Sequence, residues 1–180
     1  SYNTEGFGID DNKDWTLNNP VLNYILELDA DMVFIQEATR DIINKASHDG
    51  KVTSIYPYIG VSAASTSEAY FSKYPVAGSE TINFENSGNG CLYLKVLVGG
   101  DTLAVYNCHL QSNKLKDTEI SEYHKFIKNP TDSTHYKASK KVLKNLLEST
   151  SQRAVQARMI AERARKETAK YVIVCGDFND

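Results

Sequence analysis

Four residues with chemically useful side chains each stand just after an apolar run of the sequence. Glu37 follows MVFI, His109 follows LAVYNC, and Asp177 and Asn179 follow VIVCG. Short continuous apolar runs are typical of strands that are buried on both faces. In open α/β architectures, ligands bind in the crevice at the carboxyl ends of the strands, so we expect these side chains to share one site.

The oxygen atoms in this set suit a hard divalent cation. The carboxylates of Glu37 and Asp177 and the amide oxygen of Asn179 match the ligand preference of Mg²⁺ or Mn²⁺ and not that of zinc. A cation there would neutralise phosphate oxygens, and His109 could donate a hydrogen bond to the same phosphoryl group. The combination indicates hydrolysis of a phosphate ester, although a single glutamate or histidine after a strand is more often a structural group.

Composition bounds the class of protein. The chain has 180 residues, of which 41% are hydrophobic and 24% charged, as expected for one globular domain or a large part of one. A net charge of −3 does not favour a protein whose main role is to coat nucleic acid. No apolar run approaches the roughly 18 residues that span a bilayer.

The elements that must position these side chains follow from hydrophobic periodicity and from turn signals. Pro20 is well placed in the first turn of a helix, and the apolar residues after it recur at helical spacing up to Leu28. A second helix is predicted to begin over 41–46. Strands are predicted over 32–35, 59–61, 69–71, 79–84, 91–98 and 102–110, and a buried strand over 171–175.

The pair Gly99-Gly100 is a strong hairpin signal between two strand-forming runs. A two-residue turn there places Leu92 opposite Asn107 and Cys91 opposite Cys108. The cysteine pair is open to two interpretations, of which we favour two buried thiols over a strained cross-strand disulfide.

Residues 111–170 differ from the rest of the chain, with 14 Lys and Arg against 7 Asp and Glu. We expect a polar, irregular insertion with short helical pieces at about 111–137. One broken or two consecutive amphipathic helices then cover 137–147 and 151–169. The apolar residues expected to face inward are Val142, Leu143, Leu146, Leu147, Val155, Met159, Ile160 and Ala164. The basic surplus is either an overhang on the site or, as we favour, a solvated helix face.

Taken together, several motifs resemble the endonuclease/exonuclease/phosphatase superfamily, in the order that family shows. They are SYN at 1–3, DMVFIQE at 31–37, FSKYPV at 71–76, NCHL at 107–110, Arg153 with Gln156-Ala157, and VCGDFN at 174–179. The resemblance implies an α/β (α+β) four-layer sandwich, with two mixed β-sheets packed face to face and helices outside. It also implies a hydrolase of phosphoester bonds that depends on Mg²⁺ or Mn²⁺.

Residue by residue, the resemblance also implies roles in the site. Glu37 resembles the principal metal ligand, and Asn3 beside it resembles a residue that holds metal or phosphate. His109 resembles the histidine that binds phosphate. Asp177 resembles the carboxylate that binds near the metal and orients or activates water, and Asn179 the amide that stabilises the developing oxyanion.

The family pattern normally continues beyond the Gly-Asp-Phe-Asn loop to a later Asp-His pair, which this sequence does not match. His48, His124 and His135 are interpreted as solvated residues, and Arg40 as either the family's basic residue or a surface charge. We therefore expect residues 1–180 to be an amino-terminal part of a catalytic domain, without the second half of the sandwich. Alone, they are expected to turn over little.

The substrate stays open at this point. Phosphodiester hydrolysis is favoured, and the alternatives are a phosphomonoesterase on a sugar or lipid phosphate, a degenerate binding domain of the same fold, and a ligand-binding domain without phosphate chemistry. Nucleic acid and lipid substrates are both open, and Tyr2, Phe7 and Trp15 either line the cleft or belong to the core. We expect a monomer. By analogy with bacterial members of the family, a membrane tether upstream and an extracytoplasmic location are open possibilities.

Overall fold

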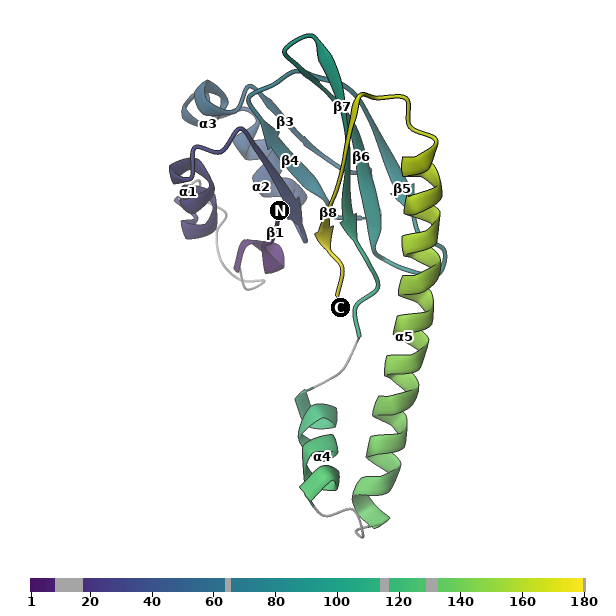
Figure 1. Cartoon of the computed structure of the whole chain (residues 1–180). Coiled ribbons are helices and arrows are strands. Elements are labelled where there is room, and N and C mark those ends of the chain that lie inside the picture. The colour runs from purple at the N-terminus through teal and green to yellow at the C-terminus, as the bar shows by residue number, and fades with distance from the viewer. Residues whose placement is uncertain (9–17, 64–65, 114–116, 129–132, 180) are drawn as a thin grey trace.

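Strands are the central feature of the computed structural model, which describes residues 1–8, 18–63, 66–113, 117–128 and 133–179. One sheet has the order β1-β2-β4-β3 and the other the order β5-β6-β7-β8 (Figure 1). The strands are β1 Tyr2–Asn3, β2 Met32–Gln36, β3 Tyr58–Val61, β4 Ala69–Ser72, β5 Val76–Asn83, β6 Gly90–Val98, β7 Asp101–His109 and β8 Tyr171–Asp177. The helices are η1 Glu5–Gly8, α1 Pro20–Glu27, α2 Arg40–Ala46, α3 Gly50–Ile55, α4 Asp117–Lys128 and α5 Ser133–Arg165.

Both sheets are mixed, as expected. β1 runs parallel to β2 in the first sheet, and β7 runs parallel to β8 in the second. The remaining neighbours are antiparallel. The carboxyl ends of the two parallel pairs carry the four residues that the sequence singled out, together with Asn3.

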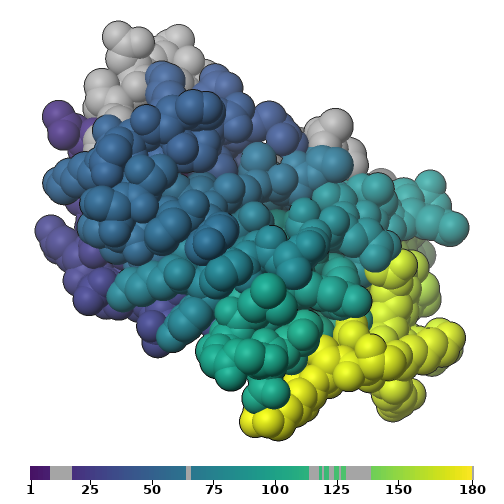
Figure 2. Space-filling model, turned by 90° about the horizontal axis from the view of Figure 1, so that it is seen from above, coloured from purple at the N-terminus to yellow at the C-terminus, as the bar shows by residue number. Residues whose placement is uncertain are grey.

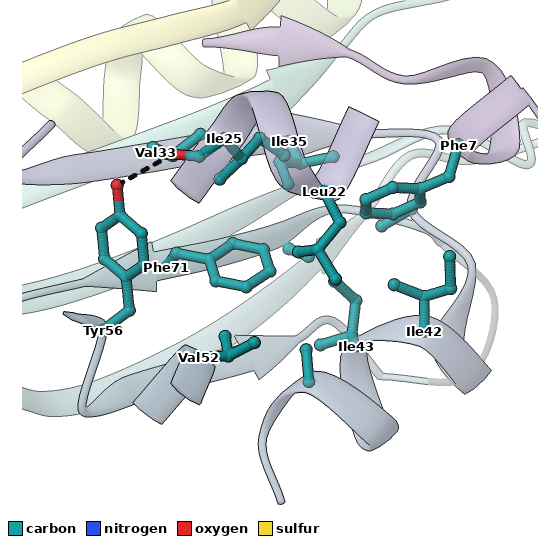
Figure 3. Close-up of a cluster of buried hydrophobic side chains, with 13 residues drawn as sticks. Phe7, Leu22, Ile25, Val33, Ile35, Ile42, Ile43, Val52, Tyr56 and Phe71 are labelled. Carbon is teal, nitrogen blue, oxygen red and sulfur yellow. Dashed lines mark hydrogen bonds between the residues drawn. The ribbon is translucent and has the colours of Figure 1, made fainter. Parts of the chain in front are cut away.

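Three hydrophobic clusters separate four layers. The first fills the space between the first sheet and α1, α2 and α3, where Leu22, Ile35 and Phe71 are fully buried and the Tyr56 hydroxyl donates to the Ile25 carbonyl at 3.3 Å (Figure 3). The second lies between the two sheets and includes Phe34 and Leu94. The predicted four-layer sandwich is therefore confirmed.

The third cluster lies under α5, where Ile160 packs with residues of the second sheet such as Tyr106. Seen from above, the yellow C-terminal segment borders the teal strands of this sheet (Figure 2). α4 and the first part of α5 extend beyond the sheets, on the side of the molecule where the C-terminus lies (Figure 1).

Local sequence signals account for the elements near the site. The Asn19 side chain caps α1 by accepting from Val21 N and Leu22 N, with Pro20 in the first turn as predicted. The hairpin register is confirmed, with Cys91 opposite Cys108. Both cysteines are buried free thiols whose sulfur atoms lie 3.4 Å apart.

The segment after β7 is more helical than the sequence indicated. An irregular insertion with short helical pieces was expected at about 111–137; residues 117–128 form α4, and α5 begins at Ser133. α5 is one continuous helix, which agrees with neither a broken helix nor two helices. The segment contains no proline between 133 and 165 to interrupt the helix.

Three of the apolar residues expected to face inward on α5 are instead exposed. Leu143, Leu147 and Val155 are 50%, 70% and 63% exposed. The buried stripe of the helix contains polar residues, Ser149 and Gln156, together with Val142 and Ile160. Periodicity of apolar residues failed here because the helix packs partly through hydrogen bonds.

The strand over 171–175 was expected to be buried, and this was wrong. Tyr171, Val172, Ile173 and Val174 are 40–52% exposed. β8 is an edge strand that pairs only with β7, so one side of its apolar residues has no neighbour among the described residues. No helix in the described part of the chain is long and apolar enough to cross a bilayer.

Candidate active site

A buried amide joins the two sheets behind the site. Asn107 of β7 donates through Nδ2 to the Ile35 carbonyl at 3.0 Å and to the Ala69 carbonyl at 3.2 Å, and its Oδ1 accepts from Gln36 Nε2. These contacts connect β7 to β2 and β4 at their ends. The side chains that follow, Glu37 after β2 and His109 at the end of β7, are thereby held close together, with His109 Nε2 3.6 Å from Glu37 Oε1.

Asn3 bridges the two carboxylates of the site. Its Nδ2 donates to Glu37 Oε1 at 3.0 Å and to Asp177 Oδ2 at 2.8 Å, so these oxygens lie within two hydrogen-bond lengths of each other. Its Oδ1 accepts from Glu5 N at 3.0 Å, which fixes the orientation of the amide. The predicted role of Asn3 as a metal ligand stays a prediction, because in this arrangement its nitrogen and not its oxygen faces the carboxylates.

The His109 imidazole lies against the same two carboxylates. Its Nε2 is 3.6 Å from Glu37 Oε1 and 3.9 Å from Asp177 Oδ2. This nitrogen is buried and has no hydrogen-bond partner among the described residues. An unpaired buried polar atom is uncommon in folded proteins, and beside two carboxylates it indicates a ligand position.

The loop after β8 is organised by its own side chains. Asp177 Oδ1 accepts from Asn179 N at 3.0 Å, and Asn179 Nδ2 donates to the Leu110 carbonyl at 3.0 Å. An amide nitrogen carries two hydrogens, so Asn179 keeps one donor for a ligand. The structure thus brings together all five residues predicted for the site.

Two of these residues have left-handed backbone conformations. Glu37 has φ of 54° and Asn179 has φ of 53°. Such angles are uncommon outside glycine, least so for asparagine, and they concentrate at functional sites where the surrounding structure compensates the strain. At Glu37 the turn follows the end of β2, and the carboxylate lies beside Asn3 and His109.

Electrostatically, the site lacks a matching positive charge. The side chains of Glu37 and Asp177 are 42% and 26% exposed, and no lysine or arginine of the described residues pairs with either. Arg40 instead donates to the Ser62 carbonyl at 2.6 Å. Two carboxylates this close repel each other unless a cation or a proton lies between them.

The donor atoms of the site suit a divalent cation that needs few protein ligands. Among the described residues, no group of three or more His, Cys, Asp and Glu side chains is arranged to hold a metal ion. Mg²⁺ does not require such a cage, because it is usually held by one or two carboxylates and keeps water and phosphate oxygens as its other ligands. The facing carboxylates of Glu37 and Asp177 therefore fit Mg²⁺.

Sequence reasoning missed Glu68, which precedes β4. Because β4 runs antiparallel to β2, its first residues lie at the edge of the sheet where β2 ends. Glu68 is fully buried, and neither carboxylate oxygen has a hydrogen-bond partner among the described residues. A search for polar residues after strands could not find it, although a glutamate directly before an apolar strand is a visible signal.

Some interpretations of single residues are settled by the structure. Phe7 belongs to the core, while Tyr2 is exposed and packs against Tyr24. His48 and His124 are exposed. Trp15 lies outside the described residues, and the side chain of His135 is not described.

A sequence profile of the endonuclease/exonuclease/phosphatase family matches residues 1–180. The chain belongs to this family. No curated protein matches the chain by sequence. The family fold explains why the two sheets place five polar residues at one edge.

Solved structures of two kinds resemble this family member. Truncated TDP2 of Caenorhabditis elegans has a TM-score of 0.62 and 20% identity, covering 100% of this chain and 61% of its own. TDP2 of D. rerio, solved with a single-strand DNA product, has a TM-score of 0.63 and 17% identity, covering 99% of this chain and 59% of its own. Sphingomyelinase C of Streptomyces griseocarneus has a TM-score of 0.64 and 20% identity, covering 99% of this chain and 63% of its own. At these identities the likeness shows the fold, and the chain spans about three fifths of the length of these structures.

Proposed function

We propose that the protein is a divalent-metal-dependent phosphoesterase that hydrolyses phosphodiester bonds by attack of water, with Mg²⁺ or Mn²⁺ as the cation. The observation that carries this proposal is the pair of facing carboxylates, Glu37 and Asp177, with the unpartnered His109 Nε2 within 4 Å of both. Membership of the family and the likeness to TDP2 and sphingomyelinase C support it.

Glu37 and Asp177 would hold the cation, and Asn3 would keep both carboxylates in register through its two donated bonds. A bound Mg²⁺ would neutralise phosphate oxygens and stabilise the charge that develops on them. His109 donates from Nε2 to a non-bridging oxygen of the phosphate, and the free N–H of Asn179 donates to the same group. Asp177 orients the attacking water and accepts its proton while the bond from phosphorus to the leaving oxygen breaks, and that oxygen leaves as an alcohol after taking up a proton from solvent.

The likeness to TDP2 and sphingomyelinase C favours a diester substrate, and the ester class is tested directly. Hydrolysis of bis(4-nitrophenyl) phosphate and of 4-nitrophenyl phosphate is measured with the full-length protein, with Mg²⁺, with Mn²⁺ and with excess EDTA. We expect metal-dependent hydrolysis of the diester, and a fall of at least about 100-fold in Glu37→Gln.

The matched control is Glu27→Gln, since Glu27 is exposed on α1 and carries the same change of charge. It is expected to keep the rate of the unchanged protein. Faster cleavage of the monoester would replace the diester assignment by the phosphomonoesterase alternative. Hydrolysis that survives in Glu37→Gln would overturn the assignment of the site.

A further inference from the structure

The segment from Leu110 to Asn113 follows His109 directly and has no regular secondary structure. Its backbone is nevertheless buried at Leu110 and Gln111, so its peptide groups need partners. Asn89 supplies one from the loop before β6, where Nδ2 donates to the Leu110 carbonyl at 2.6 Å. The other partners come from α5 and from the site.

Two side chains of α5 hold the next peptide groups. Gln156 is 4% exposed, and its Oε1 accepts from Gln111 N at 2.8 Å. Arg153 donates through Nη1 to the Gln111 carbonyl at 3.0 Å and to Asn113 Oδ1 at 2.7 Å. Arg153 and Gln156 are three residues apart and so lie on one face of the helix. We call them the α5 clamp.

The clamped segment is in turn bonded to the site. Leu110 N donates to the Asp177 carbonyl at 2.9 Å, and the Leu110 carbonyl accepts from Asn179 Nδ2 at 3.0 Å. The position of the Leu110 carbonyl therefore decides which way the second N–H of Asn179 points. The Leu110 N–H, which donates to Asp177, belongs to the peptide group that joins His109 to Leu110, so this bond also limits where the His109 imidazole lies.

We propose that Arg153 and Gln156 are positioning residues, which act on catalysis by holding the Leu110–Asn113 segment and thereby orienting Asn179 and His109. The proposal rests on the proposed function for its kinetic part, and its geometric part stands independently of it. The hydrogen bonds given for the two side chains go to Gln111, Asn113 and Thr150 and not to the site residues. A donor displaced by about 1 Å can cost about 100-fold in rate, so a clamp outside the site can control the chemical step.

Substitutions at Gln156 and Arg153 can be compared with the same changes at exposed positions of α5. Gln156→Leu removes the acceptor at nearly constant volume, whereas Gln156→Glu keeps an oxygen acceptor for Gln111 N and places its charge near Arg153. Arg153→Met removes the donors but keeps a long side chain, and it acts at a half-buried position that the core does not need. Gln152→Leu and Arg158→Met make the same changes at exposed positions of the same helix.

The first readout needs no activity. In NMR spectra we expect Gln156→Leu and Arg153→Met to shift the side-chain amide resonances of Asn179 and the imidazole resonances of His109. Gln156→Glu and the two exposed controls should leave them in place. Unchanged Asn179 and His109 resonances in both clamp variants would overturn the proposal, and if Gln156→Leu does not fold, Arg153→Met decides.

The second readout compares the effect of each variant on kcat with its effect on KM. A group that orients transition-state donors affects kcat and kcat/KM equally. We expect kcat to fall about 10- to 100-fold in Gln156→Leu with KM within about 3-fold, and Gln156→Glu to restore kcat to within about 3-fold of the unchanged protein. A loss in Gln156→Glu as large as in Gln156→Leu, or an equal loss in the exposed controls, would contradict the clamp. If the unchanged protein cleaves no ester while the resonances still shift, the proposed function fails and the positioning role stands.

Discussion

His109 shows what a single side chain contributes to this site. Its ring is almost completely buried, yet Nε2 faces two carboxylates without a hydrogen bond to either. A protein does not normally leave such an atom unpaired, and a phosphate oxygen at this position would supply the missing hydrogen-bond partner of Nε2.

For His109→Gln we predict that kcat falls by about 100-fold or more while the fold is kept. Removing one donor to a developing oxyanion typically costs 100- to 1,000-fold. Steady-state kinetics on the diester, with circular dichroism for the fold, measure the effect. His48→Gln serves as control because His48 is exposed and its imidazole is hydrogen-bonded to its sequence neighbours Ser47 and Asn44. A kcat for His109→Gln close to that of the control would remove His109 from the mechanism.

At this scale the sequence was informative about residue types and less about orientations. Glu37, His109, Asp177 and Asn179 were predicted because each follows a strand, and the structure places them together. The orientation of the Asn3 amide depends on Glu5 N, a contact that no spacing rule predicts. Glu68 was missed because it enters the same edge from an antiparallel strand.

Among the elements, β7 and β8 approach each other closely beside the site. Gly176 has φ of 140°, and a Cβ atom on it would lie 1.8 Å from the Cys108 carbonyl oxygen. No rotation of a side chain relieves a clash with backbone, so only glycine allows Asp177 and His109 to pair across these strands.

We therefore predict that Gly176→Ala lowers the free energy of unfolding by about 3 kcal/mol, since overpacking and a disallowed φ act together. Urea denaturation followed by circular dichroism measures this value. Gly78→Ala is the control, because its added Cβ meets no atom within 4 Å. Equal stability of the two variants would show that the strands separate easily at this point.

The C-terminal end of α5 is attached to the second sheet by a polar contact that titrates. The hydroxyl of Tyr93 donates to the Glu167 carboxylate, and this bond holds the pKa of Glu167 below its ordinary value, with the backbone N–H groups of Thr168 and Ala169 adding to the effect. A lowered pKa stabilises the fold above the ordinary value of about 4.5, and that stability is lost as the pH falls through the folded pKa.

For Tyr93→Phe we predict a lower free energy of unfolding than in the unchanged protein at pH 7, and a difference that shrinks as the pH falls below about 4.5. Denaturation curves at several pH values test this. Tyr24→Phe, on the exposed face of α1, should show no such pH-dependent difference. If the difference in free energy of unfolding between Tyr93→Phe and the unchanged protein stayed constant down to acid pH, the pH dependence could not be assigned to Glu167.

Prediction of the elements succeeded where apolar residues and turn residues mark them. It was wrong about the buried faces of α5 and β8. The hairpin over 90–109 and the strand before Glu37 follow from alternation, turn residues and apolar runs. α5 was misjudged because its buried stripe includes Ser149 and Gln156, whereas Leu143 and Leu147 face outward. β8 reads as a buried strand because its apolar run is the same whether or not a neighbour covers it.

Across the whole molecule, the site is formed by residues from both sheets of the sandwich. Asn3 and Glu37 come from the first sheet, and His109 and Asp177 come from the second. The ordered motifs were sufficient to predict the four-layer fold and the family. They did not reveal how closely the two carboxylates face each other, since that distance depends on the packing of one sheet on the other.

A cation held between the sheets must stabilise the folded state, because the unfolded chain has no such site. The most direct test of the metal site is therefore the thermal unfolding of the full-length protein at increasing Mg²⁺ or Mn²⁺, compared among the unchanged protein, Glu37→Gln and Glu27→Gln. We predict that Tm rises with the cation in the unchanged protein and in Glu27→Gln, by the equivalent of about 2.7 kcal/mol at 100 times Kd. Glu37→Gln should respond little. No rise in the unchanged protein, or an equal rise in Glu37→Gln, would contradict a cation site at Glu37 and with it the proposed chemistry.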